Sequence, residues 1–423
     1  MTHVINATYL QAQERIIKVM ELISERSYNL MREADTALKE IYEEIDRTAI
    51  INTGRVINAF RNNRVSESHF AASTGYGYDD PGRTVTEKVF AEVFGKEKAL
   101  VRHSIVNGTQ AITIGLFGLL RPGDTMLTIT GRPYDTLEEV IGLNGKKGMG
   151  SLADFGISYR QCELGDDFSG MLDEKVKVVH IQRSRGYGQR PTLSPDEITK
   201  ITRFVHANSK AYVMVDNCYG EFTCTEEPEA DLIVGSLIKN PGGGIALTGG
   251  YLAGSAEAIE LASYRLTSPG TGGEVGCTLG QTRNMLLGFW MAPHTVAQAL
   301  KTAAFSAYIF EKAGFDVSPK YNEKRYDLIQ TVTLHEPEKL EAFCRAIQHN
   351  SPIDSFVTPE PWDMPGYSDK VIMAAGTFTG GSTIELSADA PMRAPYTVFM
   401  QGGLTFESGK LSMLAALEAV LGQ

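Results

Sequence analysis

Two ionisable side chains stand at the ends of apolar runs in the middle of the sequence. Asp216 closes the run in "AYVMVDN", and Lys239 closes the run in "ADLIVGSLIK", directly before Asn-Pro and three glycines. In an open parallel sheet, ligands bind beyond the carboxyl ends of the strands, so successive strands would bring both groups to one crevice. A lysine removed from water has a lowered pKa and is the residue type used for Schiff bases. Each residue alone also fits a simpler interpretation, Asp216 as a cap or turn residue and Lys239 as a surface lysine on a turn.

A third feature precedes both, in "VNGTQAITIGLFGLL", where Asn107, Gly108 and Thr109 lead into a predicted helix. Free backbone N–H groups at a helix N-terminus bind anions, and a glycine there lets a phosphate approach closely. Any helix can begin after a glycine, but the chain order of anion loop, acidic strand end and lysine strand end strengthens the signal. The glycines at 242–244 would let the chain turn away without a side chain entering the crevice.

The elements that must position these residues alternate between strand and helix. Between about residues 66 and 300, short apolar runs such as "DTMLTIT" alternate with helical segments such as 194–207. This alternation predicts βαβ units and a large α/β domain with a mainly parallel sheet. Residues 301–423 have the texture of a smaller α+β domain. Residues 1–65 predict a helical N-terminal segment, in which apolar residues such as Ile17 and Met20 serve packing or subunit association.

Composition and charge exclude several classes of protein. With 43% hydrophobic residues, the chain of 423 residues can bury a core in two or three domains. Its net charge of -11 lacks the cationic excess of nucleic-acid-binding proteins. We find no signal peptide, and the longest charge-free stretch is too rich in glycine to be a membrane span. Five scattered cysteines without CxxC spacing argue against a disulfide framework and indicate a reducing cytoplasm.

Metal and nucleotide sites find no support in the spacing of residues. The eight histidines form no HxH or HxxxH pair, so we predict no metal site. The glycines after Lys239 do not form GxGxxG, and the chain contains no GxxxxGK[ST].

Taken together, these segments resemble the fold-type I enzymes that depend on pyridoxal phosphate (PLP). Within that class the chain is similar to the cystathionine and methionine lyases of Cys/Met metabolism, and most of all to the branch described as methionine gamma-lyase-like or aluminium resistance proteins. The resemblance extends from about Ser66 to the C-terminus. It is carried by "GYGYDDPGRTVTEKVFAEVFG", "NGTQAI", "VDNCYGEF", "SLIKNPGGGIALTGGY" and "QGGLTFESG". It implies a large domain of the aspartate aminotransferase type, a smaller C-terminal domain, and PLP as cofactor.

The resemblance also implies roles for the two strand-end groups. Lys239 would form the Schiff base with PLP and later move the α-proton of the substrate. Asp216 would pair with the pyridinium nitrogen and keep the ring an electron sink, with Asn217 beside it among the cofactor-binding residues.

The phosphate of PLP would be held by the helix start and by a serine. Gly108 and Thr109 would donate backbone amides, and Ser236 would add a hydroxyl. The better-known lyases carry a second hydroxyl residue directly before the lysine, where this chain has Ile238. One phosphate contact of those lyases is therefore missing.

Aromatic residues of two loops complete the cofactor site implied by the resemblance. Tyr134, in "GRPYDTLEEVIG", would stack on the PLP ring and take part in catalysis; a buried core tyrosine is the alternative. Tyr76, Tyr78 and Arg83 resemble a segment that reaches the cofactor phosphate of a neighbouring subunit, which would make a homodimer or homotetramer with shared active sites.

Two arginines are candidates for contacts with the substrate. Arg393, in "PMRAPYTVFMQGG", would clamp the substrate carboxylate through its bidentate fork, although a surface arginine fits as well. Arg185, in "QRSRGYGQRP", would lie near the cofactor or the substrate. This segment and "GYGYDDPGR" both depart from the sequences of the better-known lyases, which leaves the substrate open.

The resemblance implies a PLP-dependent carbon–sulfur lyase acting by β- or γ-elimination on a sulfur-containing amino acid. Another PLP reaction, such as transamination, aldol cleavage or racemisation, is the nearest alternative, because a fold does not fix a function. A protein that binds PLP without rapid turnover is a further alternative.

Overall fold

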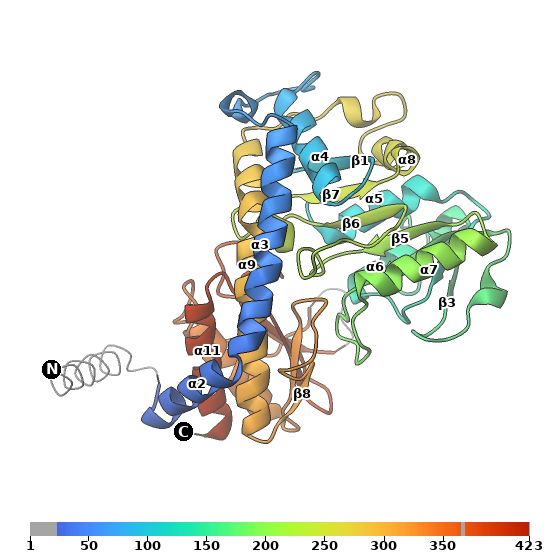
Figure 1. Cartoon of the computed structure of the whole chain (residues 1–423). Helices are drawn as coiled ribbons and strands as arrows, with labels where there is room; N and C mark the ends of the chain where they lie inside the picture. The colour runs from blue at the N-terminus through green and yellow to red at the C-terminus, as the bar shows by residue number, and fades with distance from the viewer. Residues whose placement is uncertain (1–22, 365–368, 423) are drawn as a thin grey trace.

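The computed structural model describes residues 23–364 and 369–422 (Figure 1). The helical pattern predicted around Ile17 and Met20 therefore lies outside the described residues. Within them, the N-terminal segment forms two helices, α2 (Glu25–Ala37) and α3 (Lys39–Asn62), which meet at Leu38. Figure 1 shows α3 alongside the long helix α9 (Thr282–Lys312), against which it packs.

The larger sheet has seven strands in the order β1-β7-β6-β5-β4-β2-β3. Their bounds are β1 (Lys98–Arg102), β2 (Thr125–Thr128), β3 (Ser158–Gln161), β4 (Val176–Gln182), β5 (Tyr212–Asp216), β6 (Leu232–Ser236) and β7 (Gly250–Gly254). Strands β2 to β6 pair in parallel, whereas β7 pairs antiparallel with both β6 and β1. The sheet is therefore mainly parallel, as predicted.

Apolar residues cover both faces of this sheet because alternate side chains of a strand point to opposite sides. Val178 and Met214 pack into one hydrophobic cluster with α5 (Gly108–Leu119) and α8 (Ala256–Leu266). The neighbouring residues of the same strands pack into a second cluster with α4 (Pro81–Val93), α9 and α7 (Pro195–Asn208). A further helix, α6 (Asp135–Ile141), joins the first cluster. Both faces are buried, which is the arrangement expected of βαβ units.

A second sheet of five antiparallel strands has the order β10-β11-β12-β9-β8. Its strands are β8 (Asp316–Ser318), β9 (Gln330–Thr333), β10 (Val371–Ala374), β11 (Ser387–Pro391) and β12 (Thr397–Gln401). Two helices, α10 (Pro337–His349) and α11 (Phe406–Leu421), share a hydrophobic core with it.

Helix α9 connects the two halves of the molecule. Phe289 lies in the core of the larger sheet, whereas Phe305 and Phe310 lie in the core of the smaller one. The boundary predicted at residue 300 falls inside this continuous helix. Among the residues described, no helix combines the length and the apolar character needed to cross a membrane.

Candidate active site

A cavity of about 400 Å³ lies at the carboxyl ends of three neighbouring strands. Gln182, Asp216 and Ser236 are the last residues of β4, β5 and β6, and all three line it. This is the edge at which open α/β sheets bind ligands, and the volume lies within the range of roughly 300 to 1,000 Å³ found for small-molecule sites. Six residues proposed from the sequence line the cavity: Gly108, Thr109, Tyr134, Asp216, Ser236 and Lys239.

Lys239 reaches the cavity half-buried, three residues beyond the end of β6. Its Nζ lies 4.2 Å from the centroid of the Tyr219 ring, a cation–π contact. Burial acts to lower the pKa of Lys239, but interactions with Cys218, Asp216 and Glu221 outweigh it and raise the pKa above its usual value. The direction of the shift in this structure is therefore opposite to the one expected from burial alone.

The glycines after Lys239 are explained by close packing of the backbone. Gly242 is the last residue of the short 3-10 helix η4 (Asn240–Gly242), and Gly243 caps its end. A Cβ on Gly242 would lie 1.6 Å from the carbonyl oxygen of Leu237, and a Cβ on Gly243 would lie 2.3 Å from that of Gly288 in α9. No side chain fits at either distance, so glycine is required for this turn to lie against α9. Room for a ligand in the crevice, the reason expected from the sequence, is not what these two positions provide.

The N-terminus of α5 lies directly beside the ends of β5 and β6. A Cβ on Gly108 would lie 3.0 Å from Sγ of Cys218 and 3.7 Å from Cβ of Ser236. Asn107 caps the helix, because its side chain accepts a hydrogen bond from the backbone N–H of Gln110 at 2.8 Å. The cap leaves the N–H groups of Gly108 and Thr109, the first two residues of the helix, for an anion in the cavity.

Asp216 and Ser236 are held by backbone contacts at neighbouring strand ends. Asp216 accepts a hydrogen bond from the backbone N–H of Cys218 at 3.1 Å. The hydroxyl of Ser236 accepts one from the N–H of Ile238 at 3.3 Å. Burial raises the pKa of the Cys218 thiol well above its ordinary value, so Cys218 is uncharged at neutral pH. The backbone contact fixes the side chain of Asp216 at the cavity wall, and no ion pair joins it to an arginine of the described residues.

Tyr134 lies directly before α6 and lines the cavity. Its backbone N–H donates to Oε1 of Gln182 at 2.9 Å, which attaches the start of α6 to the end of β4. Its ring lies 5.7 Å from the ring of Tyr187, centroid to centroid. The two aromatic rings form an apolar wall of the cavity.

Asn217 does not line the cavity and belongs to a buried polar network. Its Oδ1 accepts from Arg183 at 2.7 Å, and its Nδ2 donates to Glu227 at 2.9 Å. Arg183 and Glu227 form a buried ion pair of 3.0 Å. Nearby, Tyr251 donates to Glu221 at 2.8 Å, and burial raises the pKa of Glu221 to about 8. Asn217 therefore contacts this network rather than the cavity, and its role in binding the cofactor stays a prediction.

The loop before α4 also lies outside the cavity. Arg83 is buried, and its guanidinium donates to the backbone carbonyls of Gly77 and Glu274, the latter at 2.9 Å. Tyr76 and Tyr78 are exposed and stack on each other with ring centroids 5.5 Å apart. Within one chain, Arg83 therefore holds the loop. The contact of this loop with a neighbouring subunit stays a prediction.

The structure brings neither of the two other arginines to the cavity. Arg185 is buried and donates to Oγ of Ser318 at 3.0 Å, so it connects the loop after β4 to β8. Arg393 is half exposed, forms an ion pair of 2.9 Å with Asp369, and lines a separate hollow of about 40 Å³. The guanidinium of Arg393 is therefore paired with Asp369 outside the cavity that Lys239 lines.

Several residues that the sequence did not single out also line the cavity. Cys218 and Tyr219 stand inside "VDNCYGEF", so their spacing from Asp216 could have identified them. Tyr187 and Asp389 come from different halves of the chain, and the hydroxyl of Tyr187 donates to Oδ2 of Asp389 at 3.0 Å. The sequence signal for Asp389 was its position in the segment "IELSADA", because an aspartate is rarely buried among the residues of an apolar strand.

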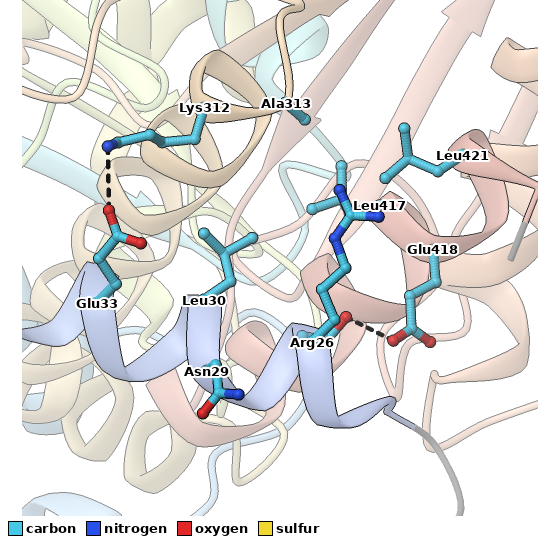
Figure 2. A pocket seen from close by; sticks show the side chains of 10 residues that line it. Arg26, Asn29, Leu30, Glu33, Lys312, Ala313, Leu417, Glu418 and Leu421 are labelled. Carbon is cyan, nitrogen blue, oxygen red and sulfur yellow. Dashed lines mark hydrogen bonds and ion pairs between the residues drawn. The ribbon is translucent and has the colours of Figure 1, made fainter.

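A second hollow of about 290 Å³ lies between α2, the end of α9 and α11 (Figure 2). Lys312 pairs with Glu33 at 3.0 Å across it. Glu418 accepts hydrogen bonds from the hydroxyl of Ser27 and from the backbone N–H of Ser24, the latter at 2.7 Å. Glu33 and Lys312 neutralise each other there, and no residue proposed from the sequence lines this hollow. The cavity at Lys239 is therefore the candidate active site.

The chain is similar to several known proteins over most of its length. A model of the family described as methionine gamma-lyase matches residues 27–421. The uncharacterized protein YnbB of Bacillus subtilis (strain 168) is 50% identical over 400 residues, which are 92% of this chain and 95% of YnbB. A solved structure from Clostridium novyi NT, described as a carbon-sulfur lyase involved in aluminum resistance, is 48% identical with a TM-score of 0.91, covering 96% of this chain and 98% of that one.

A more distant structure shows how general the fold is. The pyridoxal-5'-phosphate dependent protein YhfS of Escherichia coli is 16% identical with a TM-score of 0.61, covering 90% of this chain and 97% of that one. The fold is that of the fold-type I class, which confirms the predicted fold class and the predicted resemblance. The chain belongs to the methionine gamma-lyase family.

Proposed function

We propose that the protein is a PLP-dependent carbon–sulfur lyase, which eliminates a thiol from a sulfur-containing amino acid and releases a 2-keto acid and ammonia. The observation that carries the proposal is the convergence of Lys239, Asp216 and the N-terminus of α5 on one cavity. The similarity to the Clostridium novyi protein, described as a carbon-sulfur lyase, supports the class of reaction.

The residues present fit PLP. The absence of a side chain at Gly108 leaves space beside Cys218, where the N–H groups of α5 can bind a phosphate. The carboxylate of Asp216 could accept a hydrogen bond from a protonated ring nitrogen, and Nζ of Lys239 could bond to an aldehyde carbon, whose oxygen would leave as water. The rings of Tyr134 and Tyr219 lie at the same cavity and can cover an aromatic ring.

PLP would supply an electron sink that stabilises negative charge at the α-carbon of the substrate. The remaining steps belong to the side chains of the protein. Asp216 holds the ring nitrogen protonated, which preserves the sink. Nζ of Lys239, as a neutral amine, would take the α-proton of the substrate. The buried walls of the cavity exclude water from this transfer.

The proposal includes a homodimer or homotetramer in which Tyr76, Tyr78 and Arg83 complete the site of a neighbouring subunit. Large apolar side chains exposed on adjacent helices support association, among them Ile50 on α3 and Trp290 on α9. A light-scattering mass in solution tests this part.

The test of the reaction is the balance of its products. The purified protein is incubated with PLP and, in turn, cystathionine, methionine and cysteine, and keto acid, ammonia and thiol are measured. Equal amounts of all three support elimination. Keto acid that appears only with an added amino-group acceptor would show transamination. Bound PLP with no product from any of the amino acids would contradict the proposed lyase and favour a PLP-binding protein.

A further inference from the structure

Asp389 is a buried carboxylate at the wall that the smaller sheet contributes to the cavity. It lies in β11, and its side chain is 3% exposed. Its Oδ2 accepts the hydrogen bond from Tyr187, whereas its Oδ1 has no hydrogen-bond partner among the described residues. One half of the carboxyl group is therefore satisfied and the other half is not.

A buried carboxylate that lacks a partner costs free energy until a donor or a cation reaches it. Burial raises the pKa of Asp389 to about 6, even though the hydrogen bond from Tyr187 and the charge of Lys239 both act to lower it. Among the described residues that line the cavity, Lys239 is the one cation. The proposed function joins Lys239 to PLP, so the positive charge that faces Asp389 would be reduced in the working enzyme.

The surroundings of Asp389 suit a ligand with an apolar stem and a cationic tip. Phe399 pairs with Asp389 across β11 and β12, and Ile329 lies directly before β9. Both residues are apolar and line the cavity. A chain of methylene groups can pack on such residues while an ammonium pairs with the carboxylate. Neutral thioethers would gain the apolar contact only.

We propose that Asp389 selects substrates whose side chain carries a second cationic group beyond the carbon–sulfur bond. This proposal rests on the proposed function, because it requires an amino acid to bind at Lys239. In this proposal the carboxylate of Asp389 binds the part of the substrate that leaves as the thiol. No bond is made or broken at Asp389.

The probes are two cysteine derivatives of equal size that differ in charge, S-(2-aminoethyl)-L-cysteine and S-propyl-L-cysteine. Binding to the holoenzyme is followed through the change in absorbance of bound PLP, and turnover through KM and kcat. A charge-assisted hydrogen bond of ordinary strength predicts that the aminoethyl compound binds about 10- to 100-fold more tightly than the propyl compound. In Asp389→Asn, which keeps the shape and an acceptor for Tyr187, the two compounds should bind alike.

The matched control is Asp327→Asn. Asp327 is likewise buried with a raised pKa, and it accepts from Oγ of Ser184 at 2.8 Å, but it does not line the cavity. The ratio of the two affinities in Asp327→Asn should match that of the wild type. Circular dichroism verifies the fold of both variants, and Asp389→Ser serves if Asp389→Asn does not fold.

Each other outcome overturns the proposal. Equal binding of the two compounds by the wild type would show that no cation is selected. A preference that survives in Asp389→Asn would assign selection to other residues. A fall in kcat alone, equal for both compounds, would make Asp389 a proton donor to the leaving group. A holoenzyme that retains PLP but binds neither compound would overturn the amino-acid site itself, and a protein that does not bind PLP would overturn the proposed function first.

Discussion

Gly108, the first residue of α5, lies so close to Cys218 that a Cβ on the glycine would be 3.0 Å from the sulfur. The backbone N–H of Cys218 in turn donates to the carboxylate of Asp216. Cys218 therefore contacts both the start of α5 and the side chain of Asp216. This relationship connects the proposed phosphate site with the proposed partner of the ring nitrogen.

The first prediction concerns Gly108→Ala. The added methyl group must push against Cys218 at the N-terminus of α5, where the phosphate would bind. Overpacking of this kind costs about 1 to 3 kcal/mol, so we expect the affinity for PLP to fall about tenfold or more. Equilibrium titration with PLP measures the change.

The control is Gly170→Ala, because nothing lies within 4 Å of a Cβ at Gly170 and its φ is not positive. Unchanged PLP affinity in Gly108→Ala, with the control also unchanged, would show that the phosphate does not bind at this helix.

Much of this arrangement could be predicted from the sequence because it is local. Asp216 and Lys239 each follow an apolar run directly, and Gly108 follows the capping residue Asn107. Because parallel strands have their carboxyl ends at the same edge of the sheet, the order of strands and helices is enough to predict that these residues lie close together. The positions of these residues follow from the order of elements alone.

The contribution of the smaller sheet could not be predicted in the same way. Asp389 reaches the cavity because β11 pairs antiparallel with β10 and β12, and the sequence does not specify that register. Arg393 was chosen for its residue type, but the structure pairs it with Asp369. Helix α9 was divided by the predicted boundary because its apolar residues serve two cores, which a periodic pattern cannot distinguish.

The second prediction follows from the exposed position of Arg393. Its ion pair with Asp369 is a surface pair, and such pairs contribute about 0 to 1 kcal/mol. We expect Arg393→Ala to change KM by less than about twofold and the free energy of unfolding by less than about 1 kcal/mol. A tenfold rise in KM without a change in kcat would instead show that Arg393 binds the substrate carboxylate, as first expected from the sequence.

The third prediction concerns the pH dependence of stability through Glu221. Burial raises its pKa from the ordinary 4.5 to about 8, so the folded protein binds this proton more tightly than the unfolded chain does. The stability that the group contributes is complete below about pH 4.5 and is lost as the pH rises to about 8. We expect a loss on the order of a few kcal/mol over this interval.

Urea unfolding at several pH values measures this effect in the wild type and in Glu221→Gln. Glutamine keeps an acceptor for Tyr251, which donates to Oε1 of Glu221 at 2.8 Å, but cannot ionise. The difference in free energy of unfolding between the two proteins should therefore grow in favour of the variant between pH 5 and 8. Parallel curves would show that Glu221 is not held protonated.

The central claim is that Lys239 carries the cofactor. The most direct measurement is the absorbance spectrum of the purified protein with added PLP, followed by borohydride reduction and peptide mass spectrometry, for the wild type and for Lys239→Ala. We predict a visible band in the wild type, a PLP group fixed to the peptide that contains Lys239 after reduction, and the loss of both in the variant. A wild-type protein that stays colourless with PLP, or a label fixed to another lysine, would contradict the account.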